Sequence, residues 1–300
     1  MALVALERLG ANDDRLRQYA GFYERRLRSK PADEPPLPND NWKEAIGRPA
    51  LETTLARRFA VDLRAKGRDA LLHEVIARLT PGVASEAFHG LIRTAYAVES
   101  GDDVDIPDAL TSWVIGYAEL GRRNEQRWDT AADAFAAMHR DERFPKDFAS
   151  RSITASILKV IAIPAFDDYR LAIRNVELRD LAKMAVLIYL ATGDFTVLHL
   201  VTACHATRVL VPYLAADAVD HLAVAMLAAY ASVGRPAFDV AIQPAQDLPD
   251  WPALAARAIN RDDEHDLKLV YSCRKEEEHY GWRLHRMAAA LRLNRRPASA

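Results

Sequence analysis

Residues 262–280 read DDEHDLKLVYSCRKEEEHY, and their pattern predicts an α-helix with two polar side chains near its first turn. His265 and Lys268 are three residues apart, so a helix directs both side chains toward the same point. The aliphatic Leu267 and Leu269 flank the lysine and indicate that this part of the helix is turned inward. Buried polar groups need either a hydrogen-bond network or a metal ion. The spacing by itself is compatible with both.

The composition of the chain favours a globular protein that acts on small molecules or on other proteins. Half of its 300 residues are hydrophobic, which is ample for a sizeable core. Forty basic residues against forty-two acidic ones leave a formal charge of -2, so no overall field attracts nucleic acid or an anionic membrane. We therefore expect no nucleic-acid or membrane partner, and the oligomeric state stays open.

Cysteine content and the first residues indicate a cytoplasmic protein. Cys204 and Cys273 are too few for a disulfide framework, and free thiols fit a reducing compartment. The opening MALVALERLGANDD has no basic leader, and its apolar run is interrupted by Glu7 and Arg8 before it reaches the length of a signal peptide. No stretch approaches the ~20 apolar residues of a membrane span.

Apolar residues recur every three or four positions along most of the chain, which predicts an all-α fold without internal repeats. Helices are expected at 13–27, 49–63, 68–79, 85–99, 107–120, 128–140, 150–161, 167–191, 194–214, 220–232, 251–259 and 263–291. The proline-rich residues 29–41 predict a surface loop and not a linker, because the helices on both sides still need partners. We expect a single multi-helix domain of about ten or more helices over residues 1–291, and a disordered tail at 292–300.

Two further histidines lie in apolar helices and are candidates for a site shared with His265. His89 precedes Gly90, whose small size permits close approach of another helix or a ligand. His199 lies in a run so apolar that both faces of its helix must be largely buried. The competing interpretation of each is a core histidine bonded to a backbone carbonyl. Their spacing matches neither a zinc finger nor a His-Glu-x-x-His motif.

The remaining histidines are weaker candidates. His205 is six residues after His199, which on a helix points it roughly to the opposite side. His221 begins a predicted helix, and the histidines with charged neighbours are expected to be solvated: His73, His139, His279 and His285. The chain has no glycine-rich phosphate loop and no Gly-x-Ser-x-Gly elbow, so a Rossmann-type dinucleotide site is not expected.

Four stretches, in this order and at these separations, resemble the questin oxidase-like family: FHGLIRTAYAVES from residue 88, ALTSWVIGYAELG from 109, VLHLVTACHATRVLVPYL from 197 and DDEHDLKLVYSCRKEE from 262. Members typically show His-Gly-(Val/Ile)-Ile-Arg-Thr, then His-x-Val-Thr, then Asp-Glu-His-x-x-Lys. The resemblance extends from Met1 to about Glu278. It implies an oxidoreductase that opens the ring of an anthraquinone, or of a similar hydrophobic aromatic molecule, with molecular oxygen.

The resemblance also implies a mononuclear non-haem iron, held by histidines and by a lysine carboxylated on its amine. The matching residues here are His89, His199, His265 and Lys268. Neutral imidazoles suit ferrous iron, and a lysine amine whose pKa is lowered by burial can react with carbon dioxide to give an anionic carbamate. Arg93, one turn after His89, is a candidate catalytic residue that steadies the carbamate or a substrate oxyanion, and a structural ion pair is the alternative.

The family pattern also leaves alternatives open. Relatives carry an Asn-His pair just before the helix that begins at Met1 here, so we expect either a start codon further upstream or a lost metal ligand. His205 and Tyr96 also depart from the residues that are frequent in relatives. The competing functions are a degenerate, non-catalytic helical relative and a zinc-dependent hydrolase, because histidines alone do not select the metal. Four aromatic residues either line a substrate pocket or pack in the core: Tyr96, Trp113, Tyr117 and Tyr213.

Overall fold

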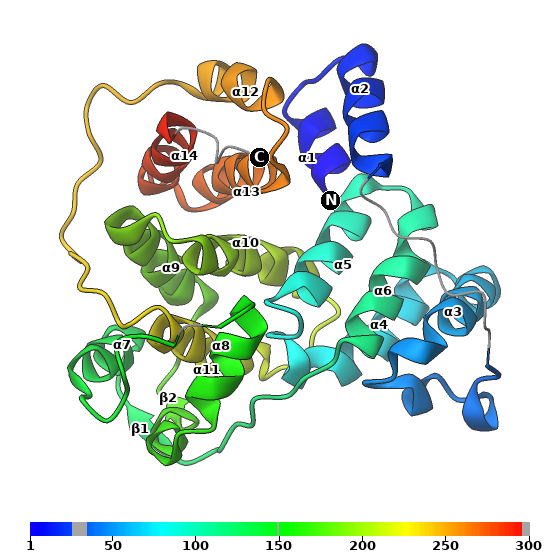
Figure 1. Ribbon diagram of the computed structural model, residues 1–300, viewed down its shortest axis with the longest axis horizontal. Helices are drawn as coiled ribbons and strands as arrows, with labels where there is room; N and C mark the ends of the chain where they lie inside the picture. Colours follow the sequence, from blue (N-terminus) through cyan, green and yellow to red (C-terminus); the bar gives the residue numbers. More distant parts are fainter. Residues whose placement is uncertain (26–34, 149, 296–300) are drawn as a thin grey trace. The chain divides into compact units, whose positions relative to one another are not determined.

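The computed structural model describes residues 1–25, 35–148 and 150–295, and these residues form an all-α structure, which confirms the predicted fold class (Figure 1). Within these ranges the strands are a single short parallel pair. Among the same residues, no helix combines the length and the apolar character needed to cross a membrane. The chain divides into two compact units, which are described separately.

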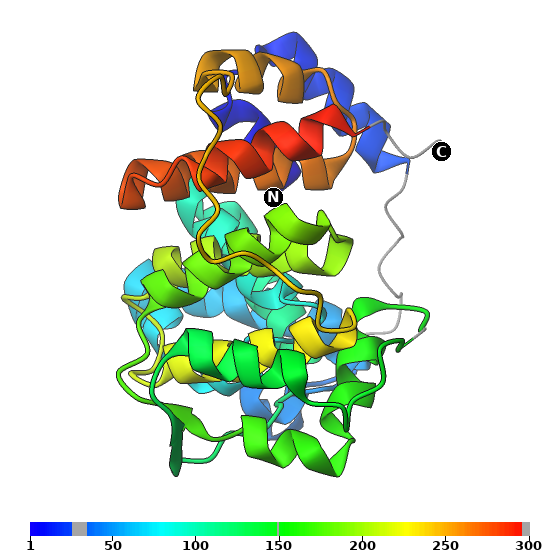
Figure 2. The same ribbon diagram turned by 90° about the vertical axis from the view of Figure 1, so that its left-hand side faces the viewer.

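The first unit combines residues 1–29, 182–205 and 237–300. Its helices are α1 (Ala2–Arg8), α2 (Asp13–Glu24), most of α9 (Leu178–Thr192), most of α10 (Phe195–Leu210), α12 (Trp251–Ile259), α13 (Glu264–Tyr280) and α14 (Leu284–Asn294). The central element is α13, which packs against α1, α12 and α14. Figure 2 shows α14, in red, running alongside α13. The buried middle of α13 explains why its sequence is aliphatic after the polar first turn.

The second unit combines residues 30–181 and 206–236. Its helices are α3 (Glu52–Lys66), α4 (Arg68–Leu79), α5 (His89–Ser100), α6 (Ile106–Ile115), α7 (Ala131–Arg140), α8 (Ile153–Ile161) and α11 (Ala218–Ser232). Short 3-10 turns lie at Pro38–Asp40, Trp42–Ala45, Pro49–Leu51, Thr80–Gly82, Asp103–Asp105 and Pro164–Tyr169. The α5–α6 and α3–α6 pairs form one part of its core, and α11 packs against α7 and α8 in another.

The predicted continuous helix at 263–291 is wrong, because the chain reverses after α13. Gly281 adopts a left-handed conformation with φ 74°, and its N–H donates to the Glu277 carbonyl. Glycine takes this conformation at little cost and commonly ends helices in this way. The reversal lays α14 back along α13 and brings Arg292, in the last turn of α14, to the first turn of α13.

The helix predicted at 167–191 is also wrong in its first half. Residues 172–173 form strand β2 (Ala172–Ile173), which pairs in parallel with β1 (Gln126–Trp128), and α9 begins only at Leu178. The backbone N–H of Arg174 donates to the Trp128 carbonyl at 2.8 Å. Backbone hydrogen bonds to a distant segment replace the bonds that a helix would form locally. Of the proline-rich loop predicted at 29–41, residues 29–34 lie outside the described residues, as do 296–300 of the predicted tail.

The predicted close approach at Gly90 is confirmed. A Cβ added at this glycine would lie 2.7 Å from the indole of Trp113, so only glycine lets α6 pack this tightly on α5. The indole nitrogen of Trp113 donates to the Gly82 carbonyl at 3.0 Å. Trp113 and Tyr96 are fully buried, as their packing interpretation predicts. These contacts hold α5, the helix that begins with His89.

Candidate metal centre

The first turn of α13 fixes the orientation of the His265 ring. Asp263 is the N-cap of the helix, and its Oδ1 accepts the backbone N–H of His265 at 2.8 Å. The same oxygen lies 3.2 Å from the ring nitrogen Nδ1 of His265. With the Nδ1 hydrogen directed to this carboxylate, the other ring nitrogen, Nε2, carries the lone pair that a metal ion can bind.

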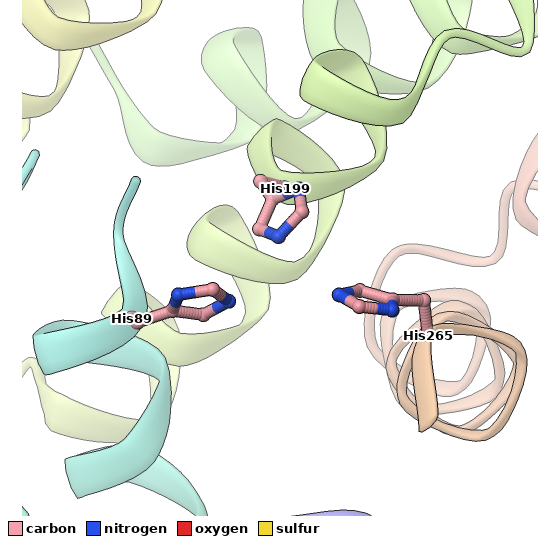
Figure 3. Close-up of side chains that lie close together, drawn as sticks. All are labelled: His89, His199 and His265. Atoms are coloured by element: carbon pink, nitrogen blue, oxygen red, sulfur yellow. The ribbon is translucent and has the colours of Figure 1, made fainter. Parts of the chain in front are cut away.

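His199, in α10, has an equivalent arrangement within the same unit. Its Nδ1 lies 2.8 Å from the carbonyl oxygen of Phe195, one turn earlier on the helix. This contact satisfies Nδ1 and leaves Nε2 as the ligand atom. The imidazoles of His199 and His265 have centroids 5.4 Å apart (Figure 3), and the Phe195 ring lies edge-on to both. The predicted alternative, a backbone-bonded core histidine, therefore describes Nδ1 of His199 but does not exclude metal binding at Nε2.

His89 is the first residue of α5 and follows an unusual turn. Glu86, Ala87 and Phe88 all have left-handed backbone conformations, with φ of 49°, 58° and 69°. This turn delays the helix predicted from residue 85 until His89. His89 belongs to the second unit, whereas His199 and His265 both belong to the first. Two of the three histidines that the sequence singled out, His199 and His265, therefore lie close together within one unit, and a metal-ligand role for His89 stays a prediction.

The left-handed turn predicts a stabilising glycine substitution. A left-handed residue other than glycine costs roughly 1–2 kcal/mol, and glycine itself loses about 0.5–1 kcal/mol in backbone entropy. We expect Ala87→Gly to raise the free energy of unfolding by about 0.5–1 kcal/mol, measured by urea denaturation. The exposed helical residue Ala132 of α7 provides the control, because Ala132→Gly should lower stability by a similar amount. A loss of stability in Ala87→Gly as large as in the control would contradict the left-handed turn.

Lys268 is 3 % exposed, one helical turn after Glu264. Its Nζ donates to the Glu264 carboxylate at 3.2 Å. Burial lowers the pKa of the Lys268 amine, and the negative charge of Glu264 opposes this effect only in part. A buried ammonium is costly to fold, so retention of lysine here is not explained by stability alone. The role of Lys268 as a metal ligand stays a prediction.

Arg93, the predicted catalytic residue, lies on α5 with an exposed side chain. Its charge acts on Glu86, whose carboxyl pKa is raised by burial and lowered in smaller measure by Ser112 and Arg93. The catalytic role of Arg93 stays a prediction.

Several residues around the site were not predicted from the sequence. Asp263, Glu264 and Phe195 contact the candidate ligands, and Arg292 contacts Asp263. An aspartate directly before a helix is a recognisable cap signal, so Asp263 was within reach of sequence reasoning. The contact of Arg292 could not be predicted from the sequence, because its partner Asp263 lies 29 residues away along the chain.

One of the weaker histidine candidates, His285, differs from expectation, whereas nothing contradicts the prediction for His205. His285 was predicted to be solvated but is 1 % exposed, because the reversal at Gly281 turns the first turn of α14 inward. His205 is fully buried, with Nδ1 3.1 Å from a carboxylate oxygen of Glu276 on α13. It belongs to a buried polar pair with Glu276.

Comparison with known proteins identifies the family of the chain. The family model described as questin oxidase-like matches residues 1–273, and the chain belongs to this family. The match contains His89, His199, His265 and Lys268, and it is consistent with an oxidoreductase in general. A search of curated proteins gave no significant match.

Proposed function

We propose that this protein is an iron-dependent oxygenase that cleaves the ring of a hydrophobic, aromatic polyketide-like substrate. The observation that carries the proposal is the pair His199 and His265, whose ring centroids lie 5.4 Å apart and whose Nδ1 atoms both face oxygen acceptors. We propose His89 as the third ligand. Membership of the questin oxidase-like family supports the class of reaction. When bound, ferrous iron would supply open coordination positions at which molecular oxygen reacts beside an organic substrate.

The donor set fits such an ion. Two of the three imidazoles direct Nδ1 to an oxygen acceptor, Asp263 for His265 and the Phe195 carbonyl for His199. This is the usual support for a histidine that binds metal through Nε2. Neutral nitrogen ligands leave the charge of a divalent ion uncompensated, and an anionic fourth ligand would offset part of it.

Lys268 is the residue we propose for that anion. As a neutral amine it would attack carbon dioxide, forming a nitrogen–carbon bond and releasing one proton. The Glu264 carboxylate, 3.2 Å from Nζ, is placed to receive this proton. Burial favours the neutral amine that the reaction needs. The product, a carbamate, would take the place of the aspartate or glutamate that many non-haem iron sites use.

Phe195 suggests how an aromatic substrate would contact the site. Its ring lies 4.6 Å from that of His265 and 5.0 Å from that of His199, yet the side chain is 45 % exposed. An exposed aromatic ring beside the ligands offers an apolar surface for a planar substrate. We propose no nucleic-acid partner and no dinucleotide cofactor.

The test compares iron with zinc in the same protein. Metal-free protein would be loaded anaerobically with Fe(II) or Zn(II), and oxygen uptake measured with a panel of hydroxylated anthraquinones. We expect oxygen uptake with iron only, and ring-opened products that contain label from ¹⁸O₂. Hydrolysis by the zinc form without oxygen uptake would favour a hydrolase. Failure of the protein to bind either metal would favour a non-catalytic family member.

A further inference from the structure

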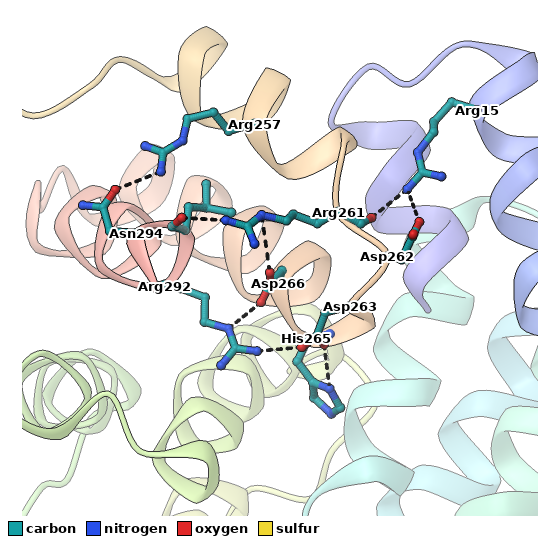
Figure 4. A network of polar contacts seen from close by, with 10 residues as sticks. Arg15, Arg257, Arg261, Asp262, Asp263, His265, Asp266, Arg292 and Asn294 are labelled. Atoms are coloured by element: carbon teal, nitrogen blue, oxygen red, sulfur yellow. Dashed lines mark hydrogen bonds and ion pairs between the residues drawn. The ribbon is translucent and has the colours of Figure 1, made fainter. Parts of the chain in front are cut away.

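Arg292 connects the end of α14 to the start of α13 through two carboxylates. Its Nη2 donates to Asp263 Oδ2 at 2.9 Å, and its Nε donates to Asp266 Oδ1 (Figure 4). The Arg292 side chain is 15 % exposed and that of Asp266 6 % exposed, so solvent screens the Arg292–Asp266 contact far less than a surface ion pair, whereas Asp263 is 38 % exposed. Arg261 adds a weaker contact to the other oxygen of Asp266, at 4.0 Å.

The two oxygens of Asp263 have separate partners. Oδ1 accepts the backbone N–H of His265 and faces the His265 ring at Nδ1, whereas Oδ2 accepts from Arg292. A carboxylate held on one side by a guanidinium cannot rotate freely about its terminal bond. The position of Oδ1, and with it the orientation of the His265 ring, therefore depends on Arg292.

Capping alone does not account for this arrangement. Asp250 caps α12 by accepting the N–H of Ala253 at 2.9 Å, and Asn12 caps α2 in the same way. Serine, threonine and asparagine cap helices about as well as aspartate. Only Asp263 among these three caps also contacts an imidazole and an arginine.

We propose that Asp263 and Arg292 are positioning residues, which hold His265 with its hydrogen on Nδ1 and its Nε2 directed to the metal. Asp263 acts directly on the ring, and Arg292 acts through Asp263. The inference rests on the proposed function, because it assigns the two residues to the metal site. Partners of this kind contribute about 10–100-fold to metal affinity in proteins.

The experiment compares Asp263→Asn, Arg292→Gln and the double variant with the wild type. Asparagine keeps the helix cap, but its amide can present an N–H to the ring and so favour the other tautomer. We expect each single variant to bind Fe(II) about 10-fold or more weakly in competition with a chromophoric chelator. The double variant should bind no more weakly than Asp263→Asn, because both changes interrupt the same contact.

Asp250→Ala is the matched control. Loss of this cap should lower the free energy of unfolding by about 1 kcal/mol and leave the Fe(II) affinity unchanged. ¹⁵N NMR of the metal-free protein provides a second readout, in which wild-type His265 carries its hydrogen on Nδ1 and the Asp263→Asn protein shows the Nε2–H form.

The outcomes separate the two proposals. Wild-type affinity and an unchanged tautomer in Asp263→Asn would overturn the positioning role while leaving the metal site intact. If the losses of Fe(II) affinity in the two single variants added up in the double variant, Arg292 would not act through Asp263. A wild-type protein that binds no Fe(II) would overturn the proposed function, and the metal-directed role of Asp263 with it.

Discussion

His265→Ala and His199→Ala proteins are each expected to lose Fe(II) binding, with the affinity reduced by about 100-fold or more, since even the partners of metal ligands contribute about 10–100-fold. Each substitution removes one of the three imidazoles proposed as ligands, and the rings of His199 and His265 lie 5.4 Å apart. A ligand removed from so small a set is replaced by water, which binds the ion far less firmly. The measurement is iron content after dialysis, together with titration of metal-free protein.

His279→Ala is the control for these variants. His279 lies in the last turn of the same helix as His265, and its side chain is exposed. Its removal should leave both the iron content and the free energy of unfolding unchanged. Stoichiometric iron in the His265→Ala protein, with circular dichroism showing native helix content, would contradict the proposed ligand set.

Lys268→Met is expected to stabilise the metal-free protein by about 1 kcal/mol or more while it weakens metal binding. Lys268 is 3 % exposed, so its ammonium loses most of its hydration on folding. Methionine has a similar volume and no charge, so the substitution removes this desolvation cost. Its partner Glu264 keeps a side chain that is 28 % exposed, so water continues to solvate that carboxylate. A residue that lowers stability and is nevertheless present is typical of a functional site.

The stability difference between Lys268→Met and the wild type should depend on pH, because burial lowers the pKa of Lys268. The unfolded chain holds the lysine proton more tightly than the folded one, so wild-type stability rises with pH until the unfolded value of about 10.5 is reached. In carbon-dioxide-free buffer, the free energy of unfolding of Lys268→Met should therefore exceed that of the wild type most at low pH. The difference should become smaller as pH rises. Urea denaturation of metal-free protein at several pH values measures it.

Added bicarbonate tests the functional part of the same prediction. Wild-type Fe(II) affinity should rise with bicarbonate because the carbamate forms, and the affinity of Lys268→Met should not respond. Lys275→Met, which removes a half-exposed surface ion pair with Glu278 on the same helix, is the control and should change stability by less than about 0.5 kcal/mol. A bicarbonate response that persists in Lys268→Met would exclude this lysine as the carbamate.

The helices that the sequence predicted best are those whose boundaries depend on local signals. The predictions at 68–79 and 251–259 match α4 and α12 because glycine or a capping aspartate precedes each helix and apolar spacing continues to its end. The His265–Lys268 spacing was also read correctly as part of one helical turn. The helix prediction was wrong at 167–173, where backbone hydrogen bonds to β1 replace helical ones. It was also wrong at Gly281, whose left-handed conformation reverses the chain.

The sequence by itself determined the helical class and the family, because periodicity and short motifs depend on residues only a few positions apart. It also predicted three histidines and Lys268 as candidate metal ligands. Tertiary structure decided what surrounds them: the left-handed turn before His89, the burial of Lys268, and the return of Arg292 to Asp263 across 29 residues. Such pairings depend on how helices pack. Packing brings together side chains whose distance in space cannot be read from their distance along the chain.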